Sequence, residues 1–105
     1  MTSGRQLKVL IVGEKHDTVV NLGILLRSEG IEVRLAEKGL EDKTMITEFQ
    51  PDAVLLDPDM PQQRGVAVAK ELMRLCGERV PKLLYVKKPI DHDALLQRVL
   101  AIKPQ

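Results

Sequence analysis

The chain has 105 residues, with 16 basic and 15 acidic side chains and a formal net charge of +1 at pH 7. This balance, with one Phe, one Tyr and no Trp, argues against a nucleic-acid-binding surface and against a polybasic membrane patch. A length of 105 residues predicts one domain over residues 1–105. A lone cysteine, an amino-terminal stretch without an apolar signal core, and the lack of any apolar run near roughly 18 residues predict a cytoplasmic location.

Four segments have the pattern of β-strands. The apolar runs at residues 7–12 and 53–56 are typical of strands buried on both faces, as in parallel sheets. Residues 31–35 alternate between apolar and polar side chains, which predicts an edge strand with one solvated face. Residues 81–86 predict the last strand.

Helices are expected between and after these strands, at residues 17–29, 40–49, 66–76 and 93–102. Gly30 ends the first helix, Pro51 follows the second, and Asp91 is placed to cap the last. Strict alternation with short connections predicts an α/β fold, a doubly wound parallel sheet with helices on both faces.

In such a sheet, a ligand site forms beyond the carboxyl ends of the strands. The residues that follow the strands are Gly13 and Glu14, then Glu37, then Asp57, and finally the Lys87-Lys88-Pro89 segment. Carboxylates and a lysine therefore converge on one rim, where they could hold a hard divalent cation and a phosphoryl group.

Four blocks of the sequence resemble, in order, the receiver domain of bacterial response regulators. They are Val9-Leu10-Ile11-Val12, then Pro51-Asp52-Ala53-Val54-Leu55-Leu56-Asp57, then Met60-Pro61 with Gly65, and Tyr85-Val86-Lys87-Lys88-Pro89-Ile90. The central block, a strand followed by Asp-x-x-Met-Pro-x-x-x-Gly, is the most specific. The resemblance covers nearly the whole chain and implies a flavodoxin-like, three-layer sandwich.

The resemblance also implies site residues. Asp57 matches the aspartate that accepts a phosphoryl group from a kinase phosphohistidine. Glu14 stands at the position of an acidic Mg²⁺ ligand, and the backbone carbonyl of Asp59 would supply another ligand beside Asp57. Lys88 matches the lysine that pairs with the acyl phosphate.

Three departures from the family pattern bear on this chemistry. Gly13 stands where the first acid of the usual pair is expected, and Glu14 is longer than the more usual Asp. No Ser or Thr ends the strand before Lys88, where Val86 and Lys87 are found. Fewer anionic ligands predict a weakened Mg²⁺ site.

The interval between Asp57 and Lys88 is also too short for the two helix–strand passes of a complete receiver, which need roughly 45 to 50 residues. Residues 80–83 resemble the start of the family's fourth strand, and residues 85–89 resemble the end of its fifth. We therefore expect four strands instead of five, in the spatial order second, first, third, last.

Two functions stay open for a receiver of this kind. The domain could accept a phosphoryl group on Asp57 from a sensor histidine kinase or another signalling protein. Alternatively, it could be a phosphorylation-independent docking module. A different class of function, cobalamin binding, is suggested weakly by the loop from Gly13 to Asp17, in which His16 would ligate cobalt. No general acid–base pair or nucleophile triad indicates an enzyme.

The remaining expectations concern the surface. The last strand becomes an apolar sheet edge that invites a homodimer or a partner chain, unless the final helix or residues 103–105 cover it. Both His16 and His92 are expected at the surface without a role, and Cys76 and Tyr85 are expected to pack.

Overall fold

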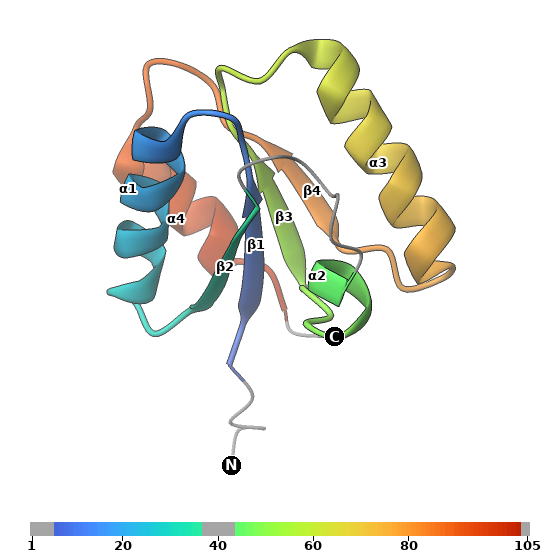
Figure 1. The fold of residues 1–105 in the computed structure, drawn as a ribbon. Helices are drawn as coiled ribbons and strands as arrows, with labels where there is room; N and C mark the ends of the chain where they lie inside the picture. Colours follow the sequence, from blue (N-terminus) through green and yellow to red (C-terminus); the bar gives the residue numbers. More distant parts are fainter. Residues whose placement is uncertain (1–5, 37–43, 104–105) are drawn as a thin grey trace.

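The computed structural model describes residues 6–36 and 44–103. Within them, strands and helices alternate along the chain (Figure 1). The elements are β1 (Lys8–Val12), α1 (His16–Arg27), β2 (Glu32–Ala36), α2 (Thr44–Thr47), β3 (Ala53–Leu56), α3 (Gln62–Cys76), β4 (Lys82–Tyr85) and α4 (His92–Leu100).

The four described strands form one parallel sheet in the order β2-β1-β3-β4, as predicted. The central strand β1 pairs with β2 on one side and with β3 on the other, with Val9 opposite both Val33 and Ala53. Strand β2, which is more polar than β1 and β3, lies at one edge of the sheet, where Arg34 is exposed. Strand β4 lies at the other edge. The prediction of four strands with an edge at 31–35 is confirmed, with β2 shifted by one residue.

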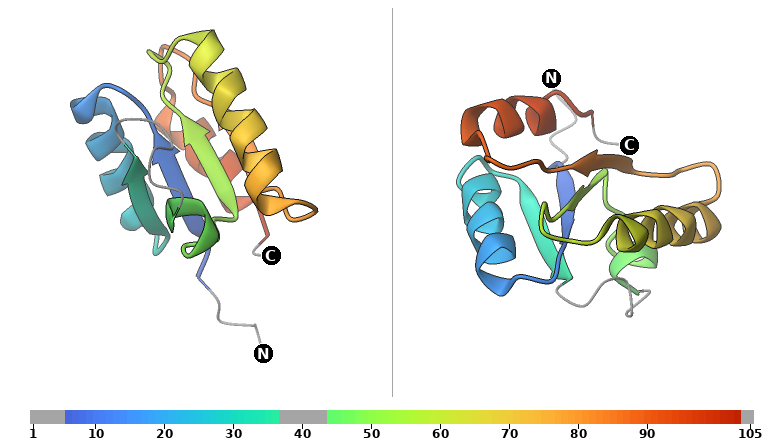
Figure 2. Two further views of the ribbon diagram at one scale, coloured as in Figure 1. Left: turned by 45° about the vertical axis from the view of Figure 1, so that its right-hand side comes forward. Right: turned by 90° about the horizontal axis from the view of Figure 1, so that it is seen from above.

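Helices cover both faces of the sheet, which makes the three layers visible in Figure 2. Helices α1 and α4 pack on one face, where Leu26 and Val99 join Val9, Ile11 and Leu55 in the core. On the opposite face α2 and α3 cover the side chains that alternate with these. That second cluster contains Leu10, Val12, Ala36, Ile46, Phe49, Val54, Leu56, Val68 and Leu72. The central strands are therefore apolar on both faces because both faces are buried.

The helix ends differ from the sequence expectation for local reasons. Helix α3 begins at Gln62, four residues before the expected start, because Pro61 fixes the backbone ahead of the first turn and its carbonyl accepts the amides of Arg64 and Gly65. The polar first turn carries no apolar periodicity, so the sequence pattern missed it. The expected cap of α4 is confirmed, since the Asp91 side chain accepts the Ala94 amide at 3.0 Å. The expected helix at 40–49 is described only from residue 44, and its first residues and Glu37 lie outside the described part.

Asp52 links the amino ends of three strands, through its side chain and amide to β1 and through its carbonyl to β4. Asp52, directly before β3, is 1% exposed and accepts the Lys8 amide at 2.8 Å. Its own amide donates to the Lys8 carbonyl at 2.8 Å, and its carbonyl accepts the Lys82 amide at 3.0 Å. These bonds join β1, β3 and β4 at the amino ends of the strands, opposite the rim where the site is predicted.

Candidate functional site

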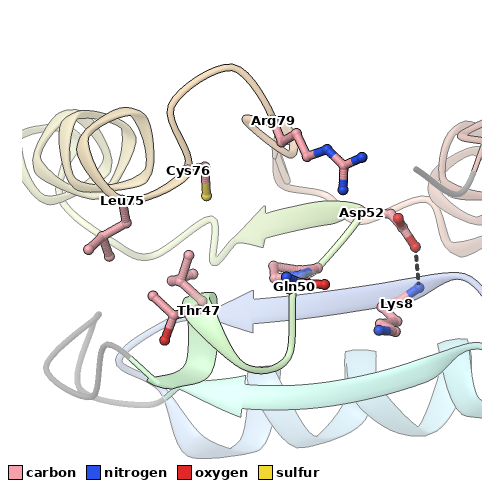
Figure 3. A pocket seen from close by; sticks show the side chains of 9 residues that line it. Lys8, Thr47, Gln50, Asp52, Leu75, Cys76 and Arg79 are labelled. Carbon is pink, nitrogen blue, oxygen red and sulfur yellow. Dashed lines mark hydrogen bonds between the residues drawn. The ribbon is translucent and has the colours of Figure 1, made fainter.

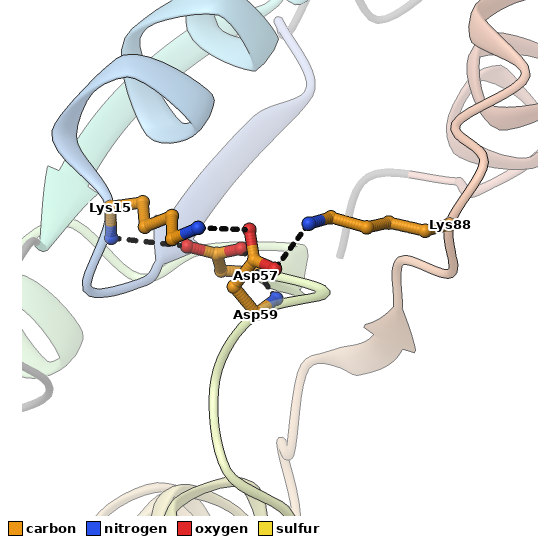
Figure 4. A network of polar contacts seen from close by, with 4 residues as sticks. All are labelled: Lys15, Asp57, Asp59 and Lys88. Atoms are coloured by element: carbon orange, nitrogen blue, oxygen red, sulfur yellow. Dashed lines mark hydrogen bonds and ion pairs between the residues drawn. The ribbon is translucent and has the colours of Figure 1, made fainter.

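Asp57 lies where β3 ends, at the carboxyl rim of the sheet, and is 3% exposed. Its Oδ1 accepts the Asp59 amide at 2.8 Å, the short-range bond that an aspartate makes with the backbone two residues on. Its Oδ2 accepts the Lys15 amide at 3.2 Å across the gap between β3 and the start of α1. The predicted phosphoacceptor is therefore a buried carboxylate with one backbone donor on each oxygen (Figure 4).

Gly13 is packed directly against this carboxylate. A Cβ at position 13 would lie 2.5 Å from Asp57 Cβ, 2.7 Å from Asp57 Oδ2 and 2.7 Å from Val19 Cγ2. These separations are shorter than side-chain atoms tolerate, so any side chain at this position requires the rim to shift. The space in which the first acid of a receiver would stand is closed in this chain.

The side chain of Asp59 forms ion pairs with two lysines of the rim. Lys15 Nζ lies 3.6 Å from Asp59 Oδ2, and Lys88 Nζ makes an ion pair with Asp59 Oδ1 (Figure 4). Lys88 therefore reaches the rim as predicted, although its contact is with Asp59 and not with Asp57. The Lys88 hydrogen bond is the main cause that lowers the pKa of Asp59 from its ordinary 3.8.

Glu14 pairs with the first turn of α3 and not with the lysines. Its Oε1 lies 3.1 Å from Arg64 Nη1, and the Glu14 side chain is 37% exposed. Sequence reasoning missed Lys15, Arg64 and the side-chain role of Asp59. The only available signal was their presence in loops that meet at the same rim, which does not specify which charges pair.

Whether Mg²⁺ fits this rim can be judged from its donors. Mg²⁺ demands near-octahedral oxygen ligands, of which usually one or two are carboxylates and several are waters. Here the position of one carboxylate is closed at Gly13, Glu14 is drawn to Arg64, and Asp59 is paired with two lysines. Among the described residues, no group of three or more His, Cys, Asp and Glu side chains is placed to hold a metal ion. The arrangement as it stands does not fit a bound Mg²⁺.

A cavity of about 380 Å³ lies beside the amino ends of β1 and β3, at the end of the strands opposite the rim (Figure 3). It is lined by Lys8, Ile46, Thr47, Gln50, Pro51, Asp52, Leu75, Cys76 and Arg79. The Cys76 thiol packs partly against the core, as expected, and burial raises its pKa, which makes it a poor nucleophile. None of the site residues predicted from the sequence lines this cavity.

The other surface expectations have mixed outcomes. His16 and His92 are exposed, as expected. Tyr85 is 47% exposed, so it is less packed than expected, although its Cε1 is 3.1 Å from the position of a Cβ on Gly65. No helix in the described ranges is long and apolar enough to cross a membrane.

Residues 9–85 match the response regulator receiver domain family. The transcriptional regulatory protein PrrA of Mycobacterium bovis is 33% identical over 84 residues, which cover 80% of this chain and 36% of PrrA. The response regulator MprA of Mycobacterium sp. (strain KMS) is 30% identical over 96 residues, 91% of this chain and 40% of MprA. The chain thus spans less than half the length of these relatives.

Solved structures share the fold. The signal receiver domain of a response regulator from Bermanella marisrubri superposes with a TM-score of 0.78 at 22% identity, over 93% of this chain and 98% of its own. The receiver domain of Ssk1 from Saccharomyces cerevisiae, solved with the histidine phosphotransfer protein Ypd1, superposes with a TM-score of 0.72 at 20% identity, over 90% and 86% of the two chains.

The chain belongs to the response regulator receiver domain family, whose members are signalling modules with a flavodoxin-like fold. This supports the receiver interpretation over cobalamin binding. Receivers generally bind Mg²⁺ at the phosphorylation site, and the described part of this chain shows no metal site.

Closure at Gly13 predicts a stability effect. We expect Gly13→Ala to lower the free energy of unfolding by about 1–3 kcal/mol, because the added methyl group overpacks against Asp57 and Val19. Gly13→Asp, which restores the acid of the family pattern, should cost at least as much. Urea unfolding followed by circular dichroism measures both. Unfolding midpoints equal to that of the wild type would show that the rim has room for a side chain.

The pairing of Asp59 predicts a pH dependence. Because its pKa is lowered in the folded chain, the stabilisation that its ion pairs provide is complete above the ordinary value of 3.8 and is lost as the pH falls through the lowered pKa. Titration of the Asp59 carboxyl carbon by NMR measures this. Lys88→Gln should raise the midpoint toward 3.8, whereas Lys87→Gln should not change it. An equal midpoint in the two variants would contradict the assigned cause.

Proposed function

We propose that this chain is a receiver module that signals by docking a partner protein, without a stable phosphoryl group on Asp57. The observation that carries this proposal is the contact between Gly13 and Asp57, which leaves no room for the missing acid of the family pattern. In phosphoryl transfer, a carboxylate can act as nucleophile when a cation neutralises the phosphoryl oxygens beside it. The ligand set for that cation is incomplete here.

Two further observations support this proposal. Asp57 is 3% exposed and both of its oxygens already accept backbone amides, so attack on phosphorus would require the rim to open. No Ser or Thr stands before Lys88 to follow a phosphoryl group. The Mg²⁺ site of Glu14, Asp57 and the Asp59 carbonyl stays a prediction from the sequence, and the pairing of Glu14 with Arg64 and of Asp59 with two lysines argues against it.

A second candidate is phosphoryl transfer to Asp57, and the position of that residue favours it. Asp57 ends β3 within reach of the loops that carry Lys15 and Lys88, whose ammonium groups could pair with a phosphoryl group. An Asp57 oxygen would attack phosphorus, an acyl phosphate bond would form, and the bond from phosphorus to the donor histidine or acetate would break.

Acetyl phosphate with Mg²⁺ separates the two candidates. We expect intact-mass spectrometry to show no phosphoryl adduct on the wild-type protein after prolonged incubation, because the cation that assists transfer lacks its ligands. A receiver with both acids at the rim, treated in parallel, is the positive control. An adduct that forms on the wild type and disappears in Asp57→Asn would contradict the proposed function and establish Asp57 as the phosphoacceptor.

The partners follow from the family. The Ssk1 receiver was solved bound to a histidine phosphotransfer protein, and by analogy a sensor histidine kinase, a phosphotransfer protein or another signalling protein is the partner class we propose. We further propose a cytoplasmic location, a signalling role without enzymatic turnover, and one receiver-like domain over residues 1–105. Neither nucleic acid nor membrane is expected as a partner, given the net charge of +1.

The edge strand β4 is the proposed surface for a second copy of the chain. The amides of Lys82 and Val86 donate toward β3, at 3.0 and 3.1 Å, so the alternation of a strand directs the amides of Leu83 and Tyr85 outward. An antiparallel pair related by a two-fold axis perpendicular to the sheet places Leu83 opposite Tyr85 of the second copy and Leu84 opposite itself. This register opposes no two lysines within β4, and it satisfies the outward backbone groups of both copies.

Light scattering at micromolar concentration measures this dimer. We expect Tyr85→Pro to give a monomer, because proline removes an outward amide while the amides that pair with β3 stay in place. Tyr85→Ala is the matched control: it removes the same side chain, keeps the amide, and should weaken the dimer less. A monomeric wild type in which the outward amides of Leu83 and Tyr85 are protected from hydrogen exchange would contradict the proposed pairing.

A further inference from the structure

The charges at the carboxyl rim cancel one another. Three carboxylates and three cationic side chains meet there, from four loops or helix ends. They are Glu14, Asp57 and Asp59, together with Lys15, Arg64 and Lys88. Each side-chain carboxylate has a partner of its own: Arg64 for Glu14, two backbone amides for Asp57, and two lysines for Asp59. Glu14 and Asp59 are therefore paired with cationic side chains, whereas the Asp57 carboxylate is held by neutral backbone amides.

A divalent cation at this rim would have to compete with the two ammonium groups. Lys15 and Lys88 pair with the Asp59 carboxylate, which follows Asp57 by two residues in the same loop (Figure 4). Their positive charges repel a dication at short range, and displacing them would break both of their ion pairs. The lysines also deliver positive charge without the octahedral geometry that Mg²⁺ demands.

We propose that Lys15 and Lys88 neutralise the acidic rim of this receiver in place of a divalent cation and thereby exclude Mg²⁺ from it. This inference rests on the proposed function and deepens it. A module that docks without phosphorylation needs its rim in one fixed state, which the two lysines would provide. Asp59 then acts as the common partner that ties the β1–α1 loop and the β4–α4 loop to the loop after β3. Lys88 thus holds the segment that leads into α4 without any bound metal.

Manganese is the probe, because it substitutes for Mg²⁺ and broadens the NMR signals of nearby amides. At roughly millimolar Mn²⁺, the upper end of the dissociation constants of weak oxygen-ligand sites, we expect the amide signals of Gly13, Lys15 and Asp59 in the wild type to be unchanged. Selective broadening of these three amides at lower concentration would overturn the proposal. This measurement needs no variant, so it decides the question even if a variant fails to fold.

Removal of the lysines should create affinity. In Lys15→Gln/Lys88→Gln, we expect Mn²⁺ binding measured by electron paramagnetic resonance to tighten by about tenfold or more, because two like charges beside the oxygens are gone. Adding Asp57→Asn to this variant should abolish the gain, which locates the metal at the rim. Lys70→Gln/Lys87→Gln removes the same charge from exposed positions outside the group and should leave binding at the wild-type level.

The outcomes separate this inference from the proposed function. Equal Mn²⁺ affinity in the wild type and in Lys15→Gln/Lys88→Gln, or an equal gain in the control pair, would overturn the exclusion of metal by these lysines. Phosphorylation of Asp57 that still forms when EDTA is present from the start would contradict the docking function while agreeing with a metal-free rim. Mn²⁺ bound at the rim of a wild-type protein that resists acetyl phosphate would overturn this inference and leave the docking function in place.

Discussion

The contact between Gly13 and Asp57 determines how the rest of the rim is built. Hydrogen bonding along β1 and β3 brings the ends of these strands side by side, and a glycine at position 13 lets the Asp57 carboxylate occupy the space between them. With its oxygens turned to the amides of Lys15 and Asp59, Asp57 is satisfied by the backbone. The lysines are then left to pair with Asp59, the next carboxylate outward.

The ion pairs of the rim matter more for geometry than for stability. The side chains of Lys15 and Lys88 are 64% and 56% exposed, and pairs of this kind are each worth little in free energy and weaken in salt. Their effect is positional, because they link loops that follow three different strands. Loops joined in this way need no bound cation to hold them together, which agrees with the proposed docking function.

The loss of one helix–strand unit explains two features of β4, its direct pairing with β3 and its exposed edge. With a single pass between Asp57 and Lys88, β4 pairs directly with β3, and the chain then continues to the rim carrying Lys88. A second consequence is that β4 is an edge strand, and its outward backbone groups have no partner strand among the described residues. The half-exposed Tyr85 and the outward amides of β4 belong to this edge, where a second chain can add.

The sequence by itself determined the fold and the rim at which a site is predicted. Doubly apolar runs such as residues 53–56, each followed by short connections and helices, indicate a parallel sheet covered on both faces, with Asp57 at its carboxyl rim. The resemblance to receivers and the short interval between Asp57 and Lys88 predicted the strand order and the four-strand count. Even the missing acid at Gly13 was visible. Only the tertiary structure decided that its space is closed, that Lys88 pairs with Asp59 and that Glu14 turns to Arg64. Strand periodicity follows from local burial, whereas the pairing of long charged side chains depends on distances between loops that are far apart in the sequence.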